Sequence, residues 1–113
     1  MRIERRQKGD VAVFDIRGKV AIGKGDVRLR EAVRAALDAG SRKILLSLKG
    51  VTAMDSAGIG EVVAAHASTV RHGGHLKLAQ LSPKVASLLQ LTQLIGVLEV
   101  HDREEAALAS FKP

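Results

Sequence analysis

Lys43-Ile44-Leu45-Leu46-Ser47-Leu48 is a nearly continuous apolar run near the middle of the chain, and the other segments can be arranged around it. A run of this kind is typical of a central strand that is covered on both faces of a sheet. We expect residues 51–58, which follow it, to form a loop that enters a helix. Asp55 and Ser56 are both good N-cap residues for that helix. The middle of the chain therefore predicts a buried strand followed by a helix.

Strand and helix signals alternate on both sides of this unit. Residues 3–8 and 11–17 flank Gly9-Asp10, which predicts a β-hairpin. The predicted strands are residues 3–8, 11–17, 43–48, 75–79 and 98–101. The predicted helices begin at Asp26, at Asp55 or Ser56, at Ser82-Pro83 and at Asp102. This order predicts an α/β fold in one domain, residues 1–113. Its mixed sheet has about five strands, largely parallel after the hairpin, and carries about four helices.

The periodicity also predicts which side chains are buried. In the second strand, Ala12, Phe14 and Ile16 share an all-apolar face that we expect to be the buried one. In the helix after Asp55, the expected buried stripe is Ile59, Val62, Val63, His66, Ala67 and Val70. At the start of the last helix, Asp102 and Glu105 have the spacing of a capping box.

Composition excludes several classes of function. The chain has no cysteine, so it forms no disulfide and no thiolate metal site. Its net charge of +6 arises entirely in residues 1–43, which hold 12 Lys and Arg against 6 Asp and Glu. Because two Phe are the only aromatic residues, no stacking platform for nucleic acid can be built, and we expect a basic face or an acidic protein partner instead. The first residues contain no apolar h-region, and no apolar run reaches about 20 residues, so we expect no secretory signal, no membrane segment and a cytoplasmic protein.

Three motifs resemble catalytic or metal sites but lack essential groups. Residues 18–25 fit the first seven positions of a P-loop, but Gly25 stands where the Mg²⁺-binding hydroxyl belongs. Met54 replaces the first glycine of a hydrolase nucleophile elbow around Ser56. The four histidines, His66, His72, His75 and His101, include no i, i+4 pair. We therefore expect no enzyme, no catalytic residue, no metal and no cofactor.

The segment Asp55-Ser56-Ala57-Gly58-Ile59-Gly60 still needs an explanation. A helix cap accounts for Asp55 or Ser56, but not for two glycines within the first turns, which cost about 1 kcal/mol each relative to alanine. Small residues at a helix start allow another surface to approach the backbone, and they leave the serine hydroxyl accessible. This pattern favours a contact surface that carries a modifiable hydroxyl.

Residues 51–60 resemble the signature segment of STAS domains, in particular those of the bacterial anti-sigma factor antagonists. The similarity extends through residues 13–18, 73–78, 81–85, 88–92 and 99–108, and so covers nearly the whole chain. The resemblance implies a STAS-like fold and a non-enzymatic switch. In that family, the unphosphorylated antagonist binds an anti-sigma factor that is also a serine kinase, and this binding frees a sigma factor. The kinase phosphorylates the serine that follows the aspartate of the signature, and a phosphatase reverses the step.

Carried over to this chain, the resemblance implies that Ser56 is the phosphorylation site. The partner-binding residues that we expect are Asp55, Ala57, Gly58, Ile59, Gly23 and Lys24. Residues 18–25 depart from the family because they are basic where an acidic segment usually meets the partner, which favours an acidic partner surface or a different target. Two alternatives remain. One is a STAS docking subunit of a lipid-transport ABC assembly or a signalling scaffold, without a phospho-switch. The other is nucleotide binding by residues 18–25 without hydrolysis.

Overall fold

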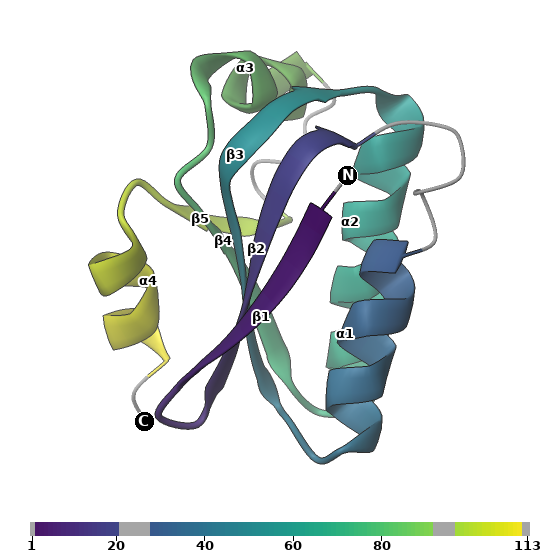
Figure 1. Ribbon diagram of the computed structural model, residues 1–113, viewed down its shortest axis with the longest axis vertical. Coiled ribbons are helices and arrows are strands. Elements are labelled where there is room, and N and C mark those ends of the chain that lie inside the picture. Colours follow the sequence, from purple (N-terminus) through teal and green to yellow (C-terminus); the bar gives the residue numbers. More distant parts are fainter. Residues whose placement is uncertain (1, 21–27, 92–96, 112–113) are drawn as a thin grey trace.

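The computed structural model describes residues 2–20, 28–91 and 97–111. Its five strands are β1 (Arg2–Lys8), β2 (Val11–Val20), β3 (Lys43–Met54), β4 (His75–Ala79) and β5 (Glu99–His101). Its four helices are α1 (Arg28–Asp38), α2 (Ser56–Arg71), α3 (Pro83–Leu91) and α4 (Glu104–Ser110). The strands form one sheet in the order β1-β2-β3-β4-β5, in which β1 is antiparallel to β2 and the other pairs are parallel (Figure 1). The predicted order of elements and the mixed sheet are confirmed.

Helices cover the two faces of the sheet unequally. In Figure 1, α1 and α2 lie along one face, α4 lies against the other, and α3 lies at one end. The larger hydrophobic cluster joins the first face to α1, α2 and α3. A smaller cluster lies beneath α4, where Val11 and Val13 of β2 meet Ala107 and Phe111. Both faces of β2 are therefore buried here, and the expectation of one buried face was incomplete because the pattern does not show that α4 returns to the second face.

β2 and β3 are longer than the sequence pattern predicts. Residues 51–54 belong to β3 rather than to a loop, and Val20 at the end of β2 lies opposite Met54. The pairing includes two register shifts, one after Asp15 and one after Gly18. Irregularities of this kind keep two strands paired while their side chains are redirected. The extension carries both strands up to the first residue of α2.

The buried side of α2 also differs from the prediction. Ile59 and Val62 are buried as expected, but Val70 is 55% exposed, and Ala65 and Thr69 take the buried positions. The Thr69 hydroxyl donates a hydrogen bond of 2.8 Å to the carbonyl oxygen of Ala65, which satisfies this buried polar group. A pattern based on hydrophobicity could not assign a threonine to the core.

The predicted N-cap of α3 is correct, and the predicted N-cap of α4 is wrong. Ser82 precedes Pro83, and its hydroxyl accepts a hydrogen bond from the backbone of Val85, as expected of an N-cap. The capping box at Asp102 is wrong, because the N-cap of α4 is Arg103 and its side chain makes no capping hydrogen bond. No helix in the described ranges is both long enough and apolar enough to cross a membrane.

Candidate functional site

The start of α2 is tied to the end of β2. Asp55 is the N-cap, and its side-chain Oδ1 accepts a hydrogen bond of 2.9 Å from the backbone nitrogen of Gly58. The backbone nitrogen of Asp55 donates to the carbonyl oxygen of Val20 at 3.3 Å, and the nitrogen of Ile59 donates to the carbonyl oxygen of Asp55 at 3.0 Å. These bonds satisfy groups that a helix start would otherwise leave open, and they fix the first turn of α2 against the sheet.

Gly58 packs against this same chain rather than against open space. A Cβ atom at position 58 would overlap the carbonyl oxygen of Val20 and would lie 2.8 Å from Cγ of Met54. A Cβ atom at Gly60, in contrast, would meet nothing within 4 Å. The close approach of β2 therefore explains why residue 58 is a glycine. The space that a side chain would occupy there is filled by Val20 and Met54 of this chain and is not open to a partner.

The structure separates the expected site residues into exposed and buried ones. Ser56, the first residue of α2, is exposed, and Asp55 and Ala57 on either side are half-buried. Gly58 is buried, and Ile59 is 5% exposed within the larger core cluster. We define the α2 start surface as Asp55, Ser56, Ala57 and Gly60. Gly58 and Ile59 lie beneath this surface and hold it in place, and their expected contact with a partner stays a prediction.

The sequence also placed Gly23 and Lys24 among the expected partner-binding residues. Gly23 and Lys24 lie outside the described residues, as does most of the P-loop-like segment 18–25. Sequence reasoning missed Lys19, which is exposed on β2 directly opposite Ala53, two positions before Asp55. Only the unexpected extension of β2 and β3 brings Lys19 to this edge of the sheet.

Two of the histidines, His72 and His101, have partners within the protein. The Nδ1 atom of His72 lies 2.8 Å from the carbonyl oxygen of Ser68, and the Nε2 atom of His101 lies 2.6 Å from the Glu99 carboxylate. Hydrogen bonds from His101 and then from Lys77 lower the pKa of Glu99 below its ordinary value. Among the described residues, no group of three His, Asp or Glu side chains is placed to hold a metal ion.

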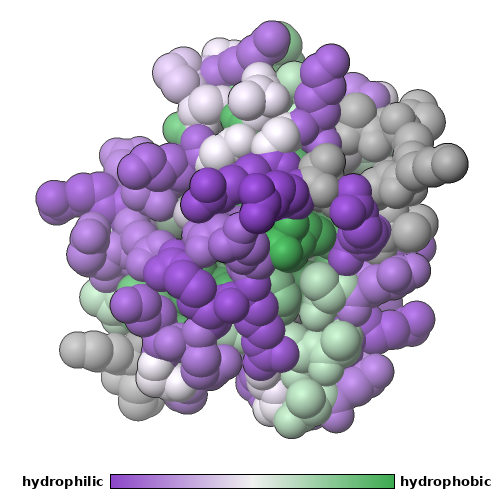
Figure 2. All heavy atoms as spheres, viewed as in Figure 1, coloured by the Kyte–Doolittle hydropathy of each residue, from purple (hydrophilic) through white to green (hydrophobic). Residues whose placement is uncertain are grey.

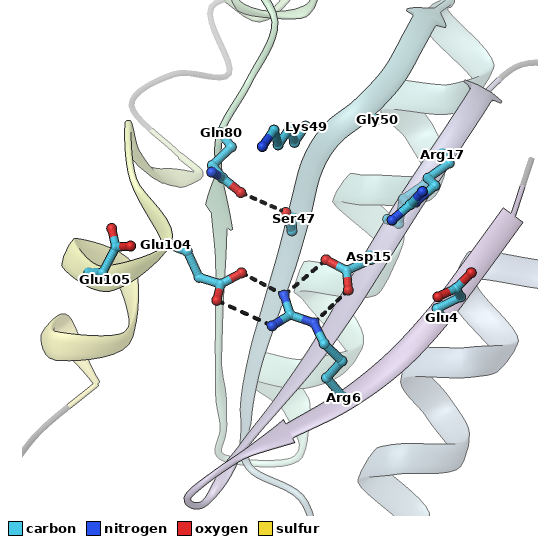
Figure 3. A pocket seen from close by; sticks show the side chains of 11 residues that line it. Glu4, Arg6, Asp15, Arg17, Ser47, Lys49, Gly50, Gln80, Glu104 and Glu105 are labelled. Carbon is cyan, nitrogen blue, oxygen red and sulfur yellow. Dashed lines mark hydrogen bonds and ion pairs between the residues drawn. The ribbon is translucent and has the colours of Figure 1, made fainter.

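A polar cavity lies on the sheet face that carries α4, and sequence reasoning did not find it. Its volume is about 790 Å³. Its centre is Arg6, which bridges Asp15 of β2 and Glu104 of α4 with closest nitrogen–oxygen distances of 2.6 Å to each (Figure 3). The hydrogen bond to Asp15, and after it the one to Glu104, raises the already high pKa of Arg6. A signal was present in the sequence, since Asp15 and Ser47 interrupt otherwise apolar strands, but only the sheet shows that they are neighbours.

Comparison with known proteins agrees with this architecture. Residues 2–107 match the STAS domain family. The chain is 27% identical over 95 residues to an anti-sigma F factor antagonist of Paenibacillus polymyxa, covering 80% of this chain and 81% of that protein. It is 28% identical over 104 residues to the anti-sigma-B factor antagonist of Bacillus subtilis (strain 168), covering 92% of this chain and 93% of that protein.

Solved structures share the fold at lower sequence identity. SpoIIAA, a Bacillus cell fate determinant, in its phosphorylated form aligns with a TM-score of 0.73 at 18% identity, covering 98% of this chain and 100% of that one. The unphosphorylated form of SpoIIAA, an anti-sigma factor antagonist, gives a TM-score of 0.72 at 17% identity and covers 96% of each chain. Since the family match extends over nearly the whole sequence and the folds agree, this protein belongs to the STAS domain family.

Proposed function

We propose that this protein is an anti-sigma factor antagonist whose α2 start surface binds an anti-sigma factor, and that phosphorylation of Ser56 prevents this binding. The observation that carries the proposal is the exposed hydroxyl of Ser56 at the first residue of α2, beside the capping carboxylate of Asp55. The names of the two curated relatives support the role of antagonist. That SpoIIAA exists in a phosphorylated form supports a switch by phosphorylation. In this role the protein is a cytoplasmic binding protein and not an enzyme.

A phosphate at Ser56 is compatible with the folded protein. It adds about −1.5 to −2 charges at neutral pH. At the N-terminus of a helix, free backbone N–H groups and the helix dipole favour a negative charge. Gly58, Ile59 and the capping bonds of Asp55 lie beneath the surface, so the added group points away from the core. The modification therefore requires no refolding.

The effect of the phosphate falls on the partner interface. There it would bring a second negative charge next to Asp55 and occupy volume on a surface of small residues. Like-charge crowding and a poorly paired anion at an interface cost several kcal/mol. A loss of about 4 kcal/mol weakens binding roughly a thousandfold, which is enough for an on/off switch.

The partner that we propose is an anti-sigma factor with serine-kinase activity, and a phosphatase that acts on phosphorylated Ser56 restores binding. The exposed Lys19 and the basic segment that contains Gly23 and Lys24 favour a partner with an acidic surface. Such a complex should weaken as ionic strength rises, because exposed charges are screened within about 8–10 Å at physiological salt.

The test combines the purified protein with each serine-kinase anti-sigma factor of the same genome and ATP. Mass spectrometry should locate the phosphate on Ser56, and the Ser56→Ala variant should bind the kinase without being modified. Thr52→Ala is the matched control, because Thr52 is an exposed hydroxyl on β3 close to Ser56 in sequence. If no such kinase modifies Ser56 and none forms a complex in gel filtration, the proposal is wrong.

The same experiment separates this role from that of a docking subunit in a lipid-transport ABC assembly or a signalling scaffold. A docking subunit would use the α2 start surface without a kinase. It would therefore bind its partner equally well as wild type and as Ser56→Asp, whereas the antagonist would lose its partner in the Ser56→Asp variant.

A further inference from the structure

The helix α4 covers only part of its face of the sheet, and the remainder forms the polar cavity described above. Figure 3 shows side chains from β1, β2, β3 and α4, together with Gln80 directly after β4, arranged around it. The cavity is lined by Glu4, Arg6, Asp15, Ile16, Arg17, Ser47, Lys49, Gly50, Gln80, Glu104 and Glu105. None of these residues belongs to the α2 start surface, so the cavity is not part of the proposed antagonist site.

One end of the cavity presents cationic and amide groups. Arg17 on β2 and Lys49 on β3 are exposed, and neither forms an ion pair within the described ranges. Arg17 lies opposite Gly50, where a Cβ atom would come within 2.7 Å of Cγ of Arg17. The missing side chain at position 50 thus makes room for the stem of Arg17 on this face. A register shift in the pairing of β2 with β3 lies between Asp15 and Arg17, next to this basic end.

Gln80 completes this basic end. It is the non-glycine residue with a positive φ, +61°, in the described part of the chain. Such a conformation is uncommon outside glycine, and here two bonds maintain it. The Gln80 backbone nitrogen donates to the carbonyl oxygen of His101 at 3.0 Å, and its side-chain Oε1 accepts from the Ser47 hydroxyl at 3.1 Å. With Oε1 engaged in this way, the Nε2 amino group is the donor that the side chain can offer to a ligand.

The other end of the cavity is acidic. Arg6 is shared between Asp15 and Glu104, so these three side chains together retain one negative charge. Glu105 adds a second, exposed carboxylate from α4. Glu4, the remaining acid in the lining, pairs with Arg2 at 3.1 Å. The cavity therefore has a positive side formed by β2 and β3 and a negative side formed by α4.

This charge arrangement selects a class of ligand. A simple anion would pair with Arg17 and Lys49 but would be repelled by the carboxylates of α4. A simple cation would pair with those carboxylates but would be repelled by Arg17 and Lys49. The lining contains no aromatic side chain on which a nucleobase could stack. Its volume lies within the range typical of small-molecule sites.

We propose that this cavity binds a small zwitterion that carries a carboxylate or phosphate group at one end and an ammonium group at the other. The oxyanion lies between Arg17, Lys49 and the Nε2 atom of Gln80, and the ammonium group lies against Glu104 and Glu105. This inference does not depend on the role of Ser56.

The experiment is an NMR titration of the full chain, labelled with ¹⁵N, at constant ionic strength. The probes are the zwitterions 4-aminobutyrate, 6-aminohexanoate and phosphoethanolamine, with butyrate and butylammonium as singly charged controls. We expect saturable shifts of the backbone amides of residues 47–50, 80 and 104–105 with at least one zwitterion. Its affinity should exceed that of both controls by about tenfold, the effect of one added charge-assisted hydrogen bond. The carboxylate and phosphate probes distinguish the two sources of the oxyanion.

Variants connect the binding to the two ends of the cavity. Lys49→Gln and Glu105→Gln should each weaken binding of the zwitterion about tenfold, whereas Lys84→Gln, an exposed change on α3, should leave it unchanged. All three positions are exposed, so the amide spectrum should retain its native dispersion. The proposal is overturned if no probe gives saturable shifts at these amides, if butyrate binds as tightly as the zwitterions, or if Lys49→Gln and Glu105→Gln bind like wild type.

Discussion

The carbonyl oxygen of Val20 at the end of β2 occupies the place that a side chain on Gly58 would need. The same oxygen accepts a hydrogen bond from the backbone of Asp55. The end of one strand is thus pressed against the first turn of the helix that carries Ser56. This contact sets the position of the α2 start surface, and the exposure of Ser56 follows from it.

Gly58→Ala should destabilise the protein, because the nearest obstructing atom is the backbone carbonyl oxygen of Val20, which cannot rotate away. We expect a loss of about 3 kcal/mol in the free energy of unfolding, at the upper end of the usual cost of overpacking. Gly60→Ala is the matched control and should be neutral or stabilise by up to about 1 kcal/mol, since its added methyl group meets open space. Urea denaturation measures both changes. Equal effects at the two positions would contradict the packing described here.

Ser56→Asp should change partner binding without changing the stability of the free protein. The favourable position of a charge at the helix N-terminus and its repulsion by Asp55 oppose each other. Its free energy of unfolding should therefore lie within about 0.5 kcal/mol of that of Ser56→Asn. Affinity for the anti-sigma factor should nevertheless fall roughly a thousandfold. Thermal unfolding and calorimetric titration measure the two quantities. A large loss of stability would mean that the switch acts by unfolding α2.

Arg6→Met should loosen α4 from the sheet. Arg6 is the cation shared by Asp15 and Glu104, and its removal leaves two partly buried carboxylates near one another. We expect a loss of about 2 kcal/mol in unfolding free energy. Arg2→Met removes a pair with Glu4 whose side chains are 77% and 50% exposed, and it should cost less than about 0.5 kcal/mol. Amide hydrogen exchange of α4 should accelerate in the first variant, and a similar result in the second would refute this assignment.

The contribution of Glu99 to stability should depend on pH. Its pKa is lowered in the folded state by hydrogen bonds from His101 and Lys77. A carboxyl group with a lowered folded-state pKa adds stability above its unfolded pKa and loses it as the pH falls through the folded value. The difference in unfolding free energy between wild type and Glu99→Gln should therefore be largest near neutral pH and should shrink as the pH falls below 4.5, the ordinary value. Urea titrations at pH 7 and pH 3 measure it, and an unchanged difference would contradict the prediction.

Much of the fold could be read from local patterns. The hairpin around Gly9-Asp10, the buried strand from Lys43 and the cap at Ser82 each depend on neighbours in sequence, and each is confirmed. The start of α2 was predicted for the same reason, because capping by Asp55 involves residues within one turn. Figure 2 shows that the face seen in Figure 1 is mostly hydrophilic, with a smaller apolar area.

Two of the wrong predictions depend on contacts between distant segments. Residues 51–54 form a strand only because the end of β2 pairs with them. Val11 and Val13 are buried because α4 returns from the far end of the chain to cover them.

The sequence alone thus specified the order of elements and the start of α2 at Asp55 or Ser56, since these depend on hydrophobic period and local capping, and it carried the resemblance to the STAS signature segment. Folding in three dimensions was needed to bury Gly58 under Val20 and to bring Arg6 to Glu104, 98 positions away along the chain. The cavity arises in the same way, from side chains of β1, β2, β3 and α4 and from Gln80 after β4, which no local pattern connects. Packing and charge pairing act through space, so their outcome appears only once the sheet has assembled.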